Sequence, residues 1–156
     1  MASQRTVTVA IMSVFFIAMG IGTITPAIQD IAEAFPHLGF STILLVFTLP
    51  SLFIIPSSIL AGVVAGSKVK YRTLLICGTL LFSLAGAAPI FMSNFTIILV
   101  ARALFGVGLG IIVALGNALV LAFYEGQGRV SMLGLGSLMM NAGGIVLQLL
   151  GGFFSS

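Results

Sequence analysis

The feature that most constrains this chain is a single arginine, Arg102, inside a long stretch that carries no other charge. Its uncharged flanks are Thr73–Ala101, with 29 residues, and Ala103–Tyr124, with 22. As one helix, this stretch would reach about 78 Å at about 1.5 Å per residue. The hydrocarbon core of a bilayer is only about 30 Å thick. The pattern therefore predicts two membrane-spanning helices, with Arg102 in the second.

The composition indicates an integral membrane protein. The 156 residues are 60% hydrophobic and only 6% charged, whereas about 25% of the residues of a soluble domain are charged. The net charge of +3 does not indicate nucleic-acid binding, because the basic residues lie between apolar stretches, as membrane topology requires. The single cysteine, Cys77, excludes an internal disulfide.

Hydropathy and turn signals divide the chain 1–156 into five predicted spans of a single helical bundle. They cover about 7–28, 41–65, 73–92, 95–123 and 130–154, so the expected fold class is an all-α membrane protein. Pro50 and Pro56 predict kinks in the second span. The first apolar stretch could imitate a secretory signal. However, no charge occurs from Thr6 to Gln29, which exceeds the roughly 7–15 residues of a signal core, so we expect a retained helix.

The distribution of basic residues predicts the orientation. One set of loops and the N-terminus hold Arg5, Lys68, Lys70, Arg72 and Arg129, and the opposite side holds only Asp30, Glu33 and His37. The positive-inside rule then puts the N-terminus in the cytoplasm and the C-terminus outside, in a plasma or inner membrane. Arg102 would lie about two turns inside the outer membrane surface. We favour a position in a cavity for it over an anchor at the interface, because a buried arginine is tolerated in a protein interior or a wet cavity.

Residues that could catalyse a reaction or hold a metal or cofactor are missing from the predicted spans. The three acidic residues lie outside the spans, and the one histidine lies in a loop. No nucleophile has a base nearby, so we expect no enzyme activity, no catalytic residues, no metal and no cofactor.

Small residues follow Arg102 at helical spacing. Gly106, Gly110 and Ala114 are four residues apart and predict a smooth stripe on which another helix packs closely, with Gly108 between them. Gly143 and Gly144 form a similar small-residue patch in the fifth span.

Three segments resemble the N-terminal half of a major facilitator superfamily transporter. Arg102-Ala-Leu-Phe-Gly106-Val-Gly108-Leu-Gly110 is similar to the signature of the fourth helix of that family. The loop with Gly62, Lys68, Lys70 and Arg72 is similar to a basic gate signature, although Gly66 and Val69 stand in place of its aspartate and its inner glycine. The run from Asn141 to Gly152 resembles the antiporter signature of the fifth helix, with Leu147-Gln148 in place of Gly-Pro.

The resemblance implies a fold of twelve helices in two halves, of which this chain would supply five, so that it looks like a fragment. It implies secondary-active transport of a small molecule by alternating access, with efflux of a hydrophobic compound and proton coupling as the expected mode. The residues expected to contact substrate or a coupling ion are Arg102, Asn117, Asn141 and Gln148. The expected partners are the lipid bilayer and a missing C-terminal half or another copy, and no nucleic acid.

A structural role remains open for each of these residues. Arg102 could be satisfied by carbonyl groups of a neighbouring helix, and the amides could pair between helices. The alternative function is a small non-transporting membrane protein, or a degenerate transporter remnant, that assembles through its glycine-rich faces.

Overall fold

The computed structural model describes residues 4–18, 33, 35–67, 69–88 and 94–155. The regular structure within these ranges is helical, which confirms the predicted all-α class for this part of the chain. The helices are α1 (Gln4–Ala18), α3 (Phe40–Ile43), α4 (Leu45–Val64), α5 (Tyr71–Ala87), α6 (Phe95–Phe123) and α7 (Gly126–Ser155).

Three of the described helical stretches are long and apolar enough to cross a membrane. They are Ser41–Val64, Phe95–Phe123 and Gly126–Leu150. The described parts of the first and third predicted spans are shorter apolar helices, Arg5–Ala18 and Tyr71–Ala87. The rest of those two spans, residues 19–28 and 89–92, falls outside the described residues, so the number of five spans stays a prediction.

The helix α4 continues through both of its prolines. Leu44 separates it from the short α3, and Pro50 and Pro56 lie inside its 20 residues. A proline has no N–H, so the carbonyls of Val46 and Leu52, four residues earlier, lose their usual helical donors. The second predicted span is therefore helical over most of its length, and it contains two backbone acceptors without regular partners.

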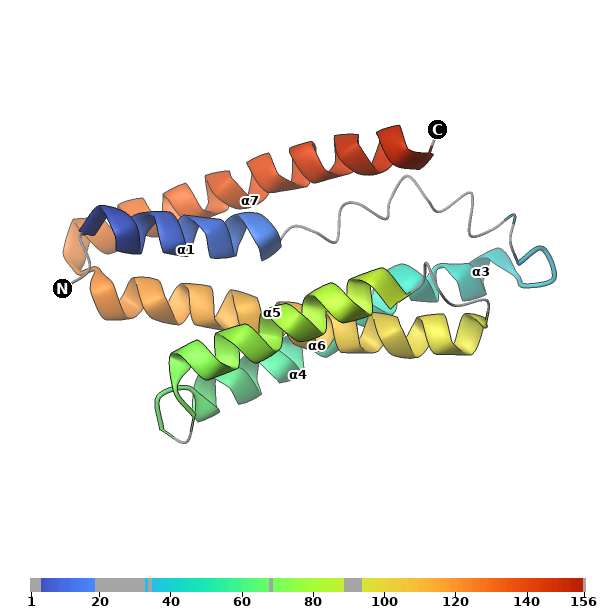
Figure 1. The fold of residues 1–156 in the computed structure, drawn as a ribbon, viewed down its shortest axis with the longest axis horizontal. Helices are drawn as coiled ribbons and strands as arrows, with labels where there is room; N and C mark the ends of the chain where they lie inside the picture. The colour runs from blue at the N-terminus through green and yellow to red at the C-terminus, as the bar shows by residue number, and fades with distance from the viewer. Residues whose placement is uncertain (1–3, 19–32, 34, 68, 89–93, 156) are drawn as a thin grey trace. The chain divides into compact units, whose positions relative to one another are not determined.

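The chain divides into two compact units, which are described separately. The second unit, residues 31–115, holds α3, α4, α5 and the first part of α6 (Figure 1). On α4 a stripe of apolar side chains spaced three or four residues apart is 62–70% exposed: Leu52, Ile55, Ile59 and Val63. In a membrane protein such an exposed apolar stripe suits contact with lipid tails.

The first unit, residues 1–30 and 116–156, holds α1, α7 and the last part of α6, with α1 lying along α7 (Figure 1). Its core is a cluster of large side chains, Ile11, Phe15, Val120 and Met132. A hydrogen bond joins two residues far apart in sequence, because the hydroxyls of Thr8 in α1 and of Tyr124 lie 2.7 Å apart. The start of α1 is thus attached to the residue that follows α6.

Candidate functional site

The candidate site is built on α6, whose start is set by an asparagine cap. The Asn94 side-chain oxygen accepts a hydrogen bond from the backbone N–H of Thr96 at 2.9 Å. This bond satisfies one of the free donors of the first helical turn. Arg102 follows two turns into the helix, surrounded in sequence by apolar residues and glycines.

Arg102 is enclosed by protein in the second unit. Its side chain is only 3% exposed, and its Nε and Nη1 atoms have no hydrogen-bond partner. The guanidinium carbon lies 5.5 Å from the centre of the Phe105 ring, within the range of a cation–π contact. Phe105 in turn stacks on Phe82 of α5, with ring centres 4.4 Å apart and planes inclined by 29°. The charge therefore has an aromatic neighbour but lacks a full set of acceptors.

Glycine residues bring α4 and α6 into backbone contact. A Cβ atom added at Gly106 would lie 2.8 Å from the Cα of Pro50, and one added at Gly110 would lie 2.6 Å from the carbonyl oxygen of Ile54. From the first contact to the second, the residue number rises by four on both helices, from Gly106 to Gly110 on α6 and from Pro50 to Ile54 on α4. The two helices therefore run parallel. Only residues without a side chain permit this approach.

From this register we infer that Arg102 lies near the level of Val46 of α4. Arg102 lies one turn before Gly106, and Val46 lies one turn before Pro50, so the pair continues the parallel contacts along the two helices. The Val46 carbonyl has no helical donor, because residue 50, which would supply the N–H, is a proline. On this inference the guanidinium lies near a carbonyl without its usual donor. The burial of Arg102 marks an interior position and not a lipid-facing one.

Gly108, which lies between Gly106 and Gly110 in the sequence, faces α5. A Cβ at Gly108 would lie 2.7 Å from the backbone nitrogen of Phe82 and 2.9 Å from the carbonyl oxygen of Gly78. The glycines of α6 therefore serve two different neighbours, α4 through Gly106 and Gly110, and α5 through Gly108.

The predicted polar residues Asn117, Asn141 and Gln148 belong to the first unit and are exposed. The Asn141 amide donates to the Ser137 carbonyl of its own helix at 2.8 Å. The structure therefore does not bring these three side chains together with Arg102 within one unit.

The glycines predicted in the fifth span belong to α7. A Cβ at Gly143 would lie 2.6 Å from the carbonyl oxygen of Phe16 in α1, and Gly144 is half-buried.

The basic loop between α4 and α5 is a tight turn. Gly66 has φ +79°, its N–H donates to the Val69 carbonyl at 2.9 Å, and a Cβ there would lie 2.9 Å from the Tyr71 ring. This conformation gives a physical reason for glycine where the resembled signature has aspartate. Of the predicted gate residues, Gly62, Lys70 and Arg72 are exposed, and Lys68 lies outside the described residues.

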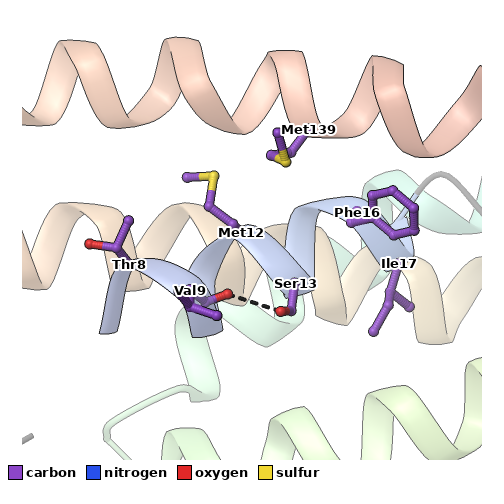
Figure 2. A pocket seen from close by; sticks show the side chains of 7 residues that line it. All are labelled: Thr8, Val9, Met12, Ser13, Phe16, Ile17 and Met139. Carbon is purple, nitrogen blue, oxygen red and sulfur yellow. Dashed lines mark hydrogen bonds between the residues drawn. The ribbon is translucent and has the colours of Figure 1, made fainter. Parts of the chain in front are cut away.

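A groove between α1 and α7 was not anticipated from the sequence. It has a volume of about 450 Å³ and is lined by Thr8, Val9, Met12, Ser13, Phe16, Ile17 and Met139. Figure 2 shows Met12 of α1 and Met139 of α7 on the side where the two helices face each other. The spacing of Val9, Met12 and Phe16 by three and four residues indicates one helical face, but not that a groove would form beside it.

Within the described ranges no three His, Cys, Asp or Glu side chains gather into a group that could hold a metal ion. The site consists of a buried charge, aromatic rings and close helix contacts.

The family comparison covers almost the whole chain. The model of the Major Facilitator Superfamily matches residues 10–156. No curated protein and no solved structure gives a significant match. The family's members are integral membrane transporters of small molecules, which agrees with the long apolar helices of this chain. By this match, the chain belongs to the major facilitator superfamily.

Proposed function

We propose that this chain forms a partial N-terminal bundle of a secondary-active transporter that exports a small hydrophobic molecule by alternating access. In this mechanism the bundle rocks against a second bundle around a site near the middle of the membrane. A C-terminal half or another copy of the chain would supply the second bundle.

The single observation that carries the proposal is the buried, incompletely paired guanidinium of Arg102. An arginine at membrane depth costs about 2.5–3.5 kcal/mol on insertion scales. Such residues usually mark substrate or ion pathways in membrane proteins. Binding a negatively charged group of the substrate, or responding to the charge of a coupling proton, would explain why a costly arginine occupies this position.

Proton coupling needs an acid that this chain does not place within a span. Its three acidic residues all lie outside the predicted spans, with Asp30 nearest to the outer end of the first. We therefore assign the proton-carrying group to the second bundle. Asn117, Asn141 and Gln148 remain proposed contacts for substrate, because their side-chain amides can both donate and accept hydrogen bonds within the membrane helices.

The proposed orientation has the N-terminus in the cytoplasm of a plasma or inner membrane. In that orientation the gate residues predicted from the sequence face the cytoplasm, as a gate between two bundles requires. They are Gly62 near the end of α4, Lys68 and Lys70 between the helices, and Arg72 at the start of α5. The exposure of Lys70 and Arg72 leaves both basic groups free to meet another surface.

The alternative, a small non-transporting membrane protein or transporter remnant that assembles through its glycine-rich helix faces, has less support. In the structure Gly106 and Gly110 already contact α4, and Gly108 contacts α5. These faces are therefore occupied within the chain itself.

The experiment is a flux assay in proteoliposomes or cells that express the transporter containing this chain. We expect Arg102→Ala to abolish flux of a lipophilic substrate while the amount of protein in the membrane stays unchanged. Flux of the unaltered protein should also fall when a protonophore removes the proton gradient.

Two outcomes separate the parts of the proposal. Normal flux in Arg102→Ala, at equal abundance, would show that Arg102 is only structural. Flux that persists without a proton gradient would show that protons do not drive transport, but it would leave the assignment as a transporter intact.

A further inference from the structure

The ring of Phe105 lies beside the guanidinium of Arg102 on one face of α6. The two residues are three positions apart, a spacing that makes side chains neighbours on a helix. The guanidinium carbon is 5.5 Å from the centre of the ring. Both side chains are only 3% exposed, so their contact is enclosed within the second unit itself.

The helix α5 holds this ring in place from two successive turns. Phe82 stacks on Phe105 with ring centres 4.4 Å apart. Gly86, one turn later on α5, leaves room for the same ring, because a Cβ there would lie 3.3 Å from it. The two helices are close at this level, since a Cβ at Gly108 would lie 2.7 Å from the backbone nitrogen of Phe82. The position of the Phe105 ring is therefore fixed by its neighbours on α5.

An aromatic ring compensates a positive charge in a different way from a carboxylate. The negative face of the ring attracts the cation as a whole, whereas a carboxylate accepts hydrogen bonds from its N–H groups. In the structure the Nε and Nη1 atoms of Arg102 are buried and have no hydrogen-bond partner. The contact with Phe105 thus supports the charge while these two donors stay free.

We propose that Phe105, held by Phe82, is the positioning residue of Arg102. Its ring stabilises the guanidinium charge in the interior and leaves the Nε and Nη1 donors for a carboxylate of a hydrophobic substrate. Phe105 acts through Arg102 and does not itself bind the carboxylate. The contact between ring and charge concerns the folded chain alone, whereas the carboxylate rests on the proposed function.

The experiment replaces Phe105 by phenylalanines that carry one, two or three fluorine atoms on the ring. Fluorine withdraws electrons from the ring face and weakens its attraction for a cation, while the size of the ring changes little. The series is made in the transporter that contains this chain, with Arg102 and with Arg102→Met. The matched control is the same series at Phe15, which is also 3% exposed and has no cation over its ring among the described residues.

Thermal unfolding of these proteins in detergent tests the contact between ring and charge. We expect the Tm to fall stepwise with each fluorine at Phe105 when Arg102 is present. It should stay level in the Arg102→Met series and in the Phe15 series. Simple packing of the ring would give the same result with and without Arg102.

Binding of two matched probes tests the role in substrate recognition. The probes are a fluorescent lipophilic carboxylate and its uncharged amide, titrated into the purified transporter. We expect the carboxylate to bind more tightly than the amide. The trifluorinated ring at Phe105 should weaken binding of the carboxylate about threefold and leave binding of the amide unchanged.

Each part of the proposal has an outcome that would overturn it. Equal Tm values across the Phe105 series, or the same decline in Arg102→Met, would show that the ring only fills space. Equal affinity for the two probes, or binding of neither, would remove the carboxylate. A flat Phe105 series together with loss of flux in Arg102→Ala would overturn the role of Phe105 and leave the proposed transport standing. A graded series with normal flux in Arg102→Ala would keep the contact and overturn its part in transport.

Discussion

The two parts of α6 pack on their neighbours in opposite ways. In the second unit, Gly106 and Gly110 bring α6 into backbone contact with α4, and a buried arginine shares that interface. In the first unit, the last part of α6 packs through large side chains, with Val120 against Ile11 and Phe15. One helix thus uses glycine contact along one part and side-chain packing along the other.

Both units nevertheless contain open space. A smaller cavity of about 200 Å³ in the second unit is lined by side chains of α4, α5 and α6, among them Ser57, Leu74 and Ile111. The approximately 450 Å³ groove of the first unit lies between α1 and α7, where Met12, Phe16 and Met139 project. The four predictions that follow test this contrast between the units.

The largest effect is expected for Gly106→Leu. A Cβ there already lies 2.8 Å from the Cα of Pro50, and backbone cannot rotate away as a side chain does. We expect a loss of about 3 kcal/mol or more of folding free energy, at or above the usual cost of overpacking. Size-exclusion profiles recorded after heating in detergent would show little folded protein.

The matched control is Gly116→Ala in the other part of α6. A Cβ there would lie 3.4 Å from side-chain atoms of Phe15 and Val14, which is nearly ordinary contact. Replacing a helical glycine by alanine favours the helix by about 1 kcal/mol, so this variant should be at least as stable as the unaltered protein. Equal damage from both variants would contradict the contrast between the two parts.

The second prediction concerns the charge in the glycine interface. Arg102→Met keeps much of the side-chain volume and removes a guanidinium whose Nε and Nη1 atoms have no partner. We expect thermal stability to rise by an amount on the order of 2 kcal/mol, while transport is lost. If stability falls instead, the guanidinium is satisfied in the folded protein, and the Val46 carbonyl is the first partner to test.

The third prediction compares the turns of the two units. Gly66 and Gly126 both have positive φ, +79° and +51°, but only Gly66 lies against a side chain, the Tyr71 ring at 2.9 Å. Alanine at either position should cost about 1–3 kcal/mol for the backbone conformation. Gly66→Ala should cost more, and adding Tyr71→Ala should remove the excess. Melting curves of the three variants check this order.

The smallest effect is expected for Thr8→Val, which removes the hydrogen bond to Tyr124. Interhelical hydrogen bonds in membranes contribute about 0.6 kcal/mol on average. Tyr124→Phe should have a similar effect, and the double variant should lose less than the two single losses together. Strict additivity in unfolding experiments would show that the two hydroxyls are not coupled.

Local patterns predicted much of the helical structure because they depend on nearby residues. The range 95–123 expected for the fourth span is the range of α6, which begins directly after the Asn94 cap. The four-residue spacing of Gly106 and Gly110 pointed to a packing face, which lies against α4.

Contacts between distant residues could not be predicted from the sequence. The Thr8–Tyr124 bond joins residues 116 positions apart, and the groove needs Met139 opposite Met12. Arg102 was expected to face a cavity, but it is enclosed beside Phe105 because α4 and α5 approach closely through glycines. Whether Arg102, Asn117, Asn141 or Gln148 contacts substrate stays a prediction.

The turn between α6 and α7 has a consequence for how the chain enters the membrane. Only Tyr124 and Glu125 separate the two helices. Arg129 donates to the carbonyl of Leu121, in the last turn of α6, and to that of Tyr124, directly after the helix. Arg129 lies in the first turn of α7, so the turn gains these two hydrogen bonds only when both helices are present. During synthesis we therefore expect α6 and α7 to leave the translocation channel together as one hairpin, with Arg129 closing it.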